Sequence, residues 1–176
     1  MTSEDRELLE HYIERGAQPW NVSVEAAWLD YELRSFVLAQ LPARRPLAVC
    51  NVGIGVGLFD DWLGHVVGAP ITSVDRDAEI GRLFALRQRR ERHPHPAMVI
   101  CGDVCDGALG RRRFDVITAV GSTVAEHDDP ARFKRALSAA LAPGGILLCA
   151  EAGEGAAADR VRTHGDTWLA CSTVQR

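Results

Sequence analysis

The chain has 176 residues, of which 47% are hydrophobic, and this length predicts one domain with a buried core. The formal net charge of −4 gives no basic surface for nucleic acid, and the arginines that cluster at 87–92 and 111–113 are interpreted as solvated faces. The sequence shows neither a leader peptide nor an apolar run that could span a membrane, so the protein is expected in the cytoplasm, without a membrane partner.

Residues 1–45 are expected to form two helices ahead of the core of the domain, residues 46–176. Apolar residues at helical spacing predict the first helix over 3–16, with a capping box that begins at Ser3. The second helix is predicted over 23–41, and the prolines that follow it stop it. Each helix carries an apolar stripe, so both are expected to pack against the domain.

A short apolar run then enters a glycine-rich turn, V-C-N-V-G-I-G-V-G, whose glycines are Gly53, Gly55 and Gly57. Glycine permits positive φ angles and a close approach of the backbone to a ligand. The third glycine comes one residue too early for the dinucleotide pattern G-x-G-x-x-G, whose last position is held by Leu58. Asp60 and Asp61 fall in the first turn of the next helix, where they would repel a phosphate. The turn therefore favours a cationic or zwitterionic ligand.

The second predicted strand, 71–75, ends in Asp75, about 20 residues beyond the glycine turn. An open α/β sheet places a carboxylate at this distance on the ribose hydroxyls of a nucleotide, and Arg76 follows directly. Asp77 is expected to cap a helix over 78–92. The spacing therefore predicts a nucleotide-type ligand at the carboxyl ends of the strands.

A third strand, 97–101, runs into Gly102-Asp103-Val104, and a fourth, 114–120, runs into a loop that ends at His127. Ligands bind at the carboxyl ends of the strands in such a sheet, so this loop is expected beside the reacting centre. Its titratable groups are Glu126 and His127.

Asp128 and Asp129 precede Pro130 and a predicted helix over 131–141. This pattern is typical of a helix cap with proline at the first helical position. Ligation of magnesium by the two aspartates is the alternative interpretation.

The C-terminal region begins with a turn at Pro143-Gly144-Gly145, which leads into a fifth strand over 146–151. Strands that alternate with helices predict a parallel sheet with right-handed crossovers. After a stretch rich in glycine and alanine at 153–158, only one weak strand is predicted, over 167–174. The domain is therefore expected to be shortened at this end, or completed by a second subunit in a homodimer.

Four of the five cysteines lie in apolar strand-like runs, where cysteine behaves as a small hydrophobic residue: Cys50, Cys101, Cys149 and Cys171. Reduced thiols are therefore expected. Cys101 and Cys105 do not form a C-x-x-C pair, and no histidine lies near them at metal-binding spacing. The sequence predicts no metal site.

Four motifs occur in a fixed order: the glycine turn, Asp75 at a strand end, the Gly102-Asp103 pair and the Pro143-Gly144-Gly145 turn. In this order the chain resembles the class I S-adenosylmethionine (SAM) dependent methyltransferases. The resemblance implies an α/β fold, a Rossmann-like, doubly wound, mostly parallel sheet with helices on both faces. Gln18-Pro19-Trp20, together with Tyr31-Glu32, is similar to the nodulation N-methyltransferase group.

The resemblance implies that SAM is the cofactor and S-adenosylhomocysteine its product. It implies that Asp103 accepts a hydrogen bond from the adenine amine and that Val104 stacks on the adenine ring. It also implies that the two N-terminal helices form a lid over the cofactor, whose aromatic side chains exclude water from the sulfonium. The lid residues are Tyr12, Trp20 and Tyr31. The residues assigned to the cofactor are Asn51, Gly53, Ile54, Gly55, Gly57, Asp75, Arg76, Gly102, Asp103, Val104, Val120 and Gly121.

Proton removal from the acceptor is assigned to His127, because an imidazole titrates near neutral pH. Glu126 is expected to orient this histidine or to bind a substrate amine. Asn51 departs from the family, which prefers an acid two residues before the first glycine to hold the methionyl amino group. We therefore expect weaker binding of that end, which Asn51→Asp would strengthen.

The favoured function is methyl transfer to nitrogen or oxygen of a small-molecule metabolite. One alternative is another reaction of SAM on the same fold, such as transfer of its aminocarboxypropyl arm, or SAM binding without catalysis. A nicotinamide-dependent oxidoreductase is a further alternative, which Leu58 disfavours. The acidic net charge disfavours nucleic acid as the acceptor.

Overall fold

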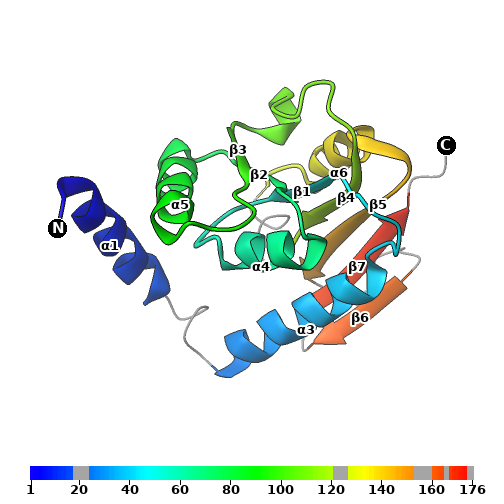
Figure 1. The fold of residues 1–176 in the computed structure, drawn as a ribbon. Coiled ribbons are helices and arrows are strands. Elements are labelled where there is room, and N and C mark those ends of the chain that lie inside the picture. Colours follow the sequence, from blue (N-terminus) through cyan, green and yellow to red (C-terminus); the bar gives the residue numbers. More distant parts are fainter. Residues whose placement is uncertain (18–23, 121–126, 153–159, 165–166, 174–176) are drawn as a thin grey trace.

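The computed structural model describes residues 1–17, 24–120, 127–152, 160–164 and 167–173. Its centre is a seven-stranded sheet in the order β3-β2-β1-β4-β5-β7-β6 (Figure 1). The first five strands in this order pair in parallel, and β7 and β6 are antiparallel. The strands are β1 (Val49–Val52), β2 (Thr72–Asp75), β3 (Met98–Cys101), β4 (Phe114–Ala119), β5 (Leu141–Ala152), β6 (Arg160–His164) and β7 (Thr167–Thr173).

The helices fall close to the predicted ranges. They are α1 (Ser3–Gly16), α3 (Val24–Gln40), α4 (Leu58–Val67), α5 (Ala78–Glu91), the short 3-10 helix η1 (Val104–Asp106) and α6 (Pro130–Ala139). Asp77 caps α5 and Asp129 caps α6 through their carboxylates, as the sequence predicts. Within the described residues, none of these helices combines the length and the apolar character needed to cross a membrane.

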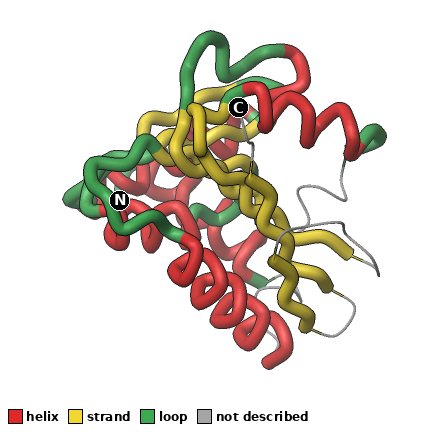
Figure 2. Tube along the Cα trace, turned by 90° about the vertical axis from the view of Figure 1, so that its right-hand side faces the viewer, coloured by secondary structure: helices red, strands yellow, loops and turns green. Residues whose placement is uncertain are grey.

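Helices cover both faces of the sheet (Figure 2). On one face, α3 and α4 enclose apolar side chains such as Val49 and Val116, and on the other, α6 and η1 enclose Cys50 and Ile117. These neighbours in sequence point to opposite faces because side chains alternate along a strand. The predicted doubly wound α/β fold is therefore confirmed.

The chain order reverses between β1 and β4, which lie side by side at the centre of the sheet. From β1 the chain proceeds outward through β2 to β3, and then returns to β4 on the other side. In open α/β sheets the crevice at such a switch point, at the carboxyl ends of the strands, is where ligands bind. The topology therefore directs attention to the turn after β1 and to the loop after β4.

Two boundary predictions are wrong. The capping box of α1 begins at Thr2, whose side chain accepts from the backbone N–H of Asp5 while its own N–H donates to that carboxylate. Thr2, not Ser3, therefore caps this helix. β5 also begins at Leu141, so the Pro143-Gly144-Gly145 turn lies within an irregular strand, whose register shifts opposite Phe114 and Val116.

The C-terminal end is more complete than the sequence suggests. β7 pairs with β5, and β6, which was not predicted, pairs with β7 to finish the sheet. The sequence of β6 carries arginine at Arg160 and Arg162, so its hydrophobic signal is weak, and its pairing along β7 supplies the missing backbone partners. The expectation that the sheet is shortened at this end is therefore wrong, whereas the expected second subunit, which would supply part of the substrate wall, stays a prediction.

α1 lies against the outer side of α5 (Figure 1). Arg82 of α5 pairs with Glu7, and Arg90 pairs with Glu4 and Asp5 at 3.4 and 3.1 Å. These pairs are largely exposed, so each contributes little stability.

Candidate cofactor-binding site

The glycine turn after β1 has the backbone that its sequence predicts. Gly53, Gly55 and Gly57 all have positive φ angles, of 88°, 55° and 74°. A Cβ atom on Gly57 would lie 2.4 Å from the buried ring of Phe84, whereas one on Gly55 would meet nothing within 4 Å. The turn is thus closely packed on its inner side and open at Gly55, which is where a ligand can approach the backbone.

Asp75 lies at the carboxyl end of β2 and is joined to the glycine turn. One carboxylate oxygen accepts from the backbone N–H of Ile54 at 2.9 Å, and the other accepts from that of Asp77 at 3.0 Å. Each oxygen has a further lone pair, so the carboxylate can still accept from two ribose hydroxyls. Asp75 is therefore fixed in position next to the turn, as its predicted role requires. Arg76 is exposed.

The end of β3 is joined to Asp75 as well, because the N–H of Gly102 donates to the Asp75 carbonyl at 2.9 Å. Asp103 caps η1, with one carboxylate oxygen accepting from the N–H of Cys105 at 2.7 Å. Val104 is 6% exposed and packs in the hydrophobic core. This burial differs from the expectation for Val104, since stacking on an adenine ring requires an accessible side chain. Asp103, which is partly exposed, keeps its second oxygen for a ligand.

His127 lies beside Asp103. Ligand atoms of the two residues are within 4.8 Å of one another, and the His127 ring stacks on Phe133 of α6, with centroids 4.0 Å apart. If Asp103 reads the adenine, His127 is at the adenine end of SAM, and not beside the methyl group. The predicted role of Asp103, contact with the adenine, is therefore incompatible with the predicted role of His127, removal of a proton beside the methyl group. Glu126 and Gly121 lie outside the described residues, and Val120, directly after β4, is partly exposed.

A buried polar network lies beneath the glycine turn. Asn51 on β1 lies opposite Ser73 on β2 and Thr118 on β4. Asn51 and Ser73 hydrogen-bond to Asp60, and Thr118 hydrogen-bonds to Asn51. The amide of Asn51 donates to Asp60 at 3.0 Å and to the Gly53 carbonyl at 3.1 Å, and it accepts from Thr118 at 2.7 Å. The Ser73 hydroxyl donates to the other oxygen of Asp60 at 2.5 Å.

This network changes the interpretation of two residues. Asn51 is 1% exposed and its amide is occupied by protein partners, which differs from the expected contact with the methionyl amino group. Asp60 is also 1% exposed, so it is a core residue and not an exposed acid of the first helical turn. Burial raises the pKa of Asp60 to about 7, against the opposing effect of its hydrogen bonds from Ser73 and Asn51. Both residues position the start of α4, and with it the turn that precedes this helix.

Asp60 is expected to make stability fall as the pH rises toward neutrality. An unfolded aspartate loses its proton near pH 4, but the folded chain retains it up to about pH 7. The stability that the proton contributes is present below about pH 4 and is lost as the pH rises through 7, at no more than about 1.4 kcal/mol per pH unit. Urea unfolding of the wild type and of Asp60→Asn across this range measures it. A difference in unfolding free energy between the two proteins that does not change with pH would contradict the assignment.

Arg87 is a site residue that sequence reasoning missed. Its position in an arginine cluster indicates a solvated face, but it is 7% exposed. It donates to the carbonyls of Val56 and Gly57 at 2.8 and 3.3 Å and pairs with Asp61. Arg87 therefore fixes the inner side of the glycine turn from α5. The exposed neighbours in the two clusters agree with the prediction: Arg89, Arg90, Arg92, Arg111, Arg112 and Arg113.

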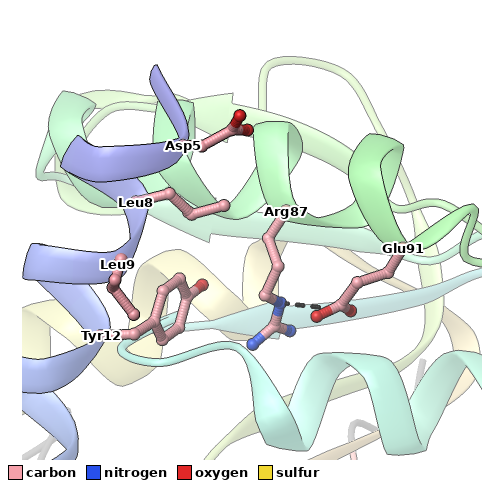
Figure 3. A pocket seen from close by; sticks show the side chains of 6 residues that line it. All are labelled: Asp5, Leu8, Leu9, Tyr12, Arg87 and Glu91. Atoms are coloured by element: carbon pink, nitrogen blue, oxygen red, sulfur yellow. Dashed lines mark ion pairs between the residues drawn. The ribbon is translucent and has the colours of Figure 1, made fainter. Parts of the chain in front are cut away.

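The lid residues are only partly brought to the site. Tyr12 lies over Arg87, with its ring centroid 5.0 Å from the guanidinium carbon, at a pocket of about 360 Å³ between α1 and α5 (Figure 3). The pocket is lined by Asp5, Leu8, Leu9, Tyr12, Arg87 and Glu91. Tyr31 is 58% exposed and pairs with Trp28 on the surface of α3. Trp20 lies outside the described residues.

The fold and the site together define the class of the protein: a Rossmann-like domain with a glycine turn after β1 and an acid at the end of β2. A family model described as "Methyltransferase domain" matches residues 26–174. The chain therefore belongs to this family, the class I SAM-dependent methyltransferases. A comparison with the curated proteins gives no match.

Solved structures of methyltransferases share the fold. The N-methyltransferase NodS from Bradyrhizobium japonicum WM9, in complex with S-adenosylhomocysteine, aligns with a TM-score of 0.69 over 98% of either chain, at 16% identity. The rRNA methyltransferase aviRa from Streptomyces viridochromogenes aligns with a TM-score of 0.61 over 89% of this chain and 85% of its own, at 16% identity.

The fold also occurs in a protein named for a different reaction. The [4+2]-cyclase SpnF aligns with a TM-score of 0.63 at 22% identity over 81% of this chain. The chain spans 50% of the length of SpnF. At these identities, the likeness to solved structures establishes the fold alone.

Proposed function

We propose that the protein transfers the methyl group of SAM to a nitrogen or oxygen atom of a small-molecule acceptor. The observation that carries the proposal is the position of Asp75, whose carboxylate is fixed beside the open side of the glycine turn. This arrangement suits the ribose of a nucleoside, because each oxygen of the Asp75 carboxylate keeps a lone pair that can accept from a ribose hydroxyl.

The acceptor is proposed to be a metabolite and not a nucleic acid. The formal net charge of −4 opposes binding of a polyanion, and the exposed arginines at 111–113 lie on one short loop. NodS, which is named as an N-methyltransferase, matches this chain over nearly the whole length of both proteins. Free thiols support a reducing compartment such as the cytoplasm, and those described are Cys50, Cys101, Cys105 and Cys149.

In the proposed reaction, the residues of this chain bind and align more than they react. SAM supplies a sulfonium methyl group that a nucleophile displaces in line, so proximity and orientation provide most of the rate enhancement. Asp75 and the glycine turn would hold the nucleoside, and Arg87 keeps the turn in place from below. We assign His127 to the adenine end of the cofactor, beside Asp103, instead of to removal of the acceptor's proton.

Asp75→Asn is expected to weaken binding of S-adenosylhomocysteine at least tenfold, because a neutral amide forms weaker bonds to the two ribose hydroxyls than a carboxylate does. Isothermal titration calorimetry measures this effect. The matched control is Asp77→Asn, which removes an acid two residues away but keeps an effective helix cap, and it should bind the ligand as the wild type does. Equal affinities for the wild type and Asp75→Asn would refute the ribose assignment.

The alternative functions differ in their ligands and products. Other SAM chemistry would add the aminocarboxypropyl group instead of one methyl group to the acceptor, and mass spectrometry of candidate acceptors distinguishes the two. A silent SAM binder would bind SAM and leave every acceptor unchanged. A nicotinamide-dependent enzyme would bind NAD, which Leu58 at the start of α4 disfavours.

A further inference from the structure

Three different metal-binding side chains meet at the edge of the sheet, next to the proposed adenine end of the site. A carboxylate oxygen of Asp103, the thiol sulfur of Cys105 and a ring nitrogen of His127 all lie within 4.8 Å of one another. All three residues are partly exposed, so an ion can reach them from solvent. We propose that Asp103, Cys105 and His127 form a binding site for Zn²⁺, a function separate from methyl transfer.

The three residues come from two segments that α6 holds together. Arg132 of α6 donates to the Cys105 carbonyl at 3.2 Å and to the Asp106 carboxylate at 2.8 Å, which fixes η1. On the same helix, the fully buried Phe133 carries the stacked ring of His127. Asp103 is fixed in turn by the N–H of Cys105. The ligands are therefore supported by neighbouring contacts, as outer-shell groups support the ligands of known metal sites.

The ligand set selects the kind of ion. Magnesium and calcium prefer oxygen ligands alone, whereas a site with one sulfur, one nitrogen and one oxygen suits Zn²⁺. Tetrahedral zinc with bonds of about 2.0–2.3 Å places its ligand atoms roughly 3.3–3.8 Å apart. The ligand atoms therefore need to approach one another by at most about 1.5 Å to reach this geometry, a distance that changes of side-chain torsion can supply. Because the three residues are partly exposed, water can supply the fourth ligand.

This proposed site differs from the expectation drawn from sequence spacing, which was that the chain has no metal site. Cys105 has no histidine near it along the chain, and the fold brings His127 to it from the far end of the loop after β4. A second group of histidines, His65, His93 and His95, could compete for the ion. The ring centroid of His65 lies 4.8 Å from that of His93 and 6.4 Å from that of His95. Among the described residues, the cluster of possible metal ligands that includes a cysteine is the one with His127.

One consequence rests on the proposed function. Asp103 is the residue that we assign to the adenine amine, so a bound Zn²⁺ ion would occupy a group that SAM uses. Zinc and S-adenosylhomocysteine should therefore weaken each other's binding by the same factor, because linkage between two ligands is reciprocal.

Titration of the full chain with Co²⁺ tests the site, because cobalt bound by a thiolate gives a charge-transfer absorption that histidine and carboxylate ligands do not. The titration is done under reducing conditions and in the absence of SAM. The wild type should show this band at one equivalent of Co²⁺, and Zn²⁺ should remove it. Cys105→Ser should abolish the band, and Asp103→Asn and His127→Gln should each weaken cobalt binding at least tenfold.

Two control variants keep the test specific. Cys101→Ser removes an exposed thiol outside the proposed site, and His95→Ala alters the second histidine group. Both should leave the band unchanged, and circular dichroism checks that all variants are folded. A band that survives Cys105→Ser, or its absence from the wild type, would overturn the proposal. A chain that binds S-adenosylhomocysteine without the cobalt band overturns the zinc site alone, and one that shows the band without binding the nucleoside overturns only the proposed function.

Discussion

Asn51→Asp is expected to destabilise the folded chain by about 2–4 kcal/mol above pH 7, and not to tighten the binding of SAM. The amide nitrogen of Asn51 lies 3.0 Å from a carboxylate oxygen of Asp60, and both residues are buried. The substitution replaces this donor by an oxygen and brings two carboxyl groups into contact. Because such a pair shares one proton, the loss of stability should be smaller near pH 5 and larger near pH 8. Chemical denaturation at the two pH values measures both effects.

The matched control exchanges the two side chains. Asn51→Asp combined with Asp60→Asn restores one donor and one acceptor between β1 and α4, so it should recover much of the stability lost in the single variant. The Gly53 carbonyl loses its donor in this variant, so recovery should be incomplete. If Asn51→Asp is as stable as the wild type and binds S-adenosylhomocysteine more tightly, the amide faces the cofactor after all, and the network has been misassigned.

Gly57→Ala is expected to destabilise the fold by about 3 kcal/mol. The left-handed backbone alone costs an alanine roughly 1–2 kcal/mol, and overpacking adds about 1–3 kcal/mol. The overpacking arises because the new Cβ would lie 2.4 Å from the ring of Phe84, which is 0% exposed, and 3.2 Å from Arg87. Neither side chain can move away easily, because Phe84 is fully buried and Arg87 is hydrogen-bonded to the carbonyls of the turn.

Gly55→Ala is the companion substitution, and it is expected to reduce ligand affinity more than it reduces stability. Its φ angle of 55° gives a similar backbone penalty, but its Cβ would project into open space. We expect it to cost about 1 kcal/mol of stability and to weaken binding of S-adenosylhomocysteine more than tenfold, because the methyl group occupies the ligand's side of the turn. Thermal unfolding and calorimetry separate the two variants. A Gly55→Ala protein with unchanged affinity would show that the ligand does not approach the turn there.

The order of helices and strands could be predicted because local patterns carry it. Apolar strands, the glycine turn and the cap of α5 at Asp77 are all visible within a few residues, and the structure confirms them. β6 was missed because arginines interrupt its apolar pattern, and its pairing with β7 is a contact that no local pattern displays.

The roles of several polar residues could not be predicted for a related reason. Asp60 and Asp61 are adjacent acids at the start of one helix, and nothing in their sequence shows that Asp60 is enclosed by Asn51 and Ser73 while Asp61 pairs with Arg87. Burial of a charged or polar side chain depends on which strands become neighbours. The same holds for His127, whose position beside Asp103 follows from the packing of α6 against η1.

The network under the glycine turn also bears on how the sheet reaches its alignment. Asn51 stands directly across from Ser73 on one neighbouring strand and Thr118 on the other. A slip of one residue in β1 would turn the amide to the opposite face and bring an aliphatic side chain toward Asp60, which would lose the hydrogen bond from Asn51 and keep only the one from Ser73. A shifted alignment is thus less stable at the centre of the molecule, so these polar groups favour the observed register of the three strands.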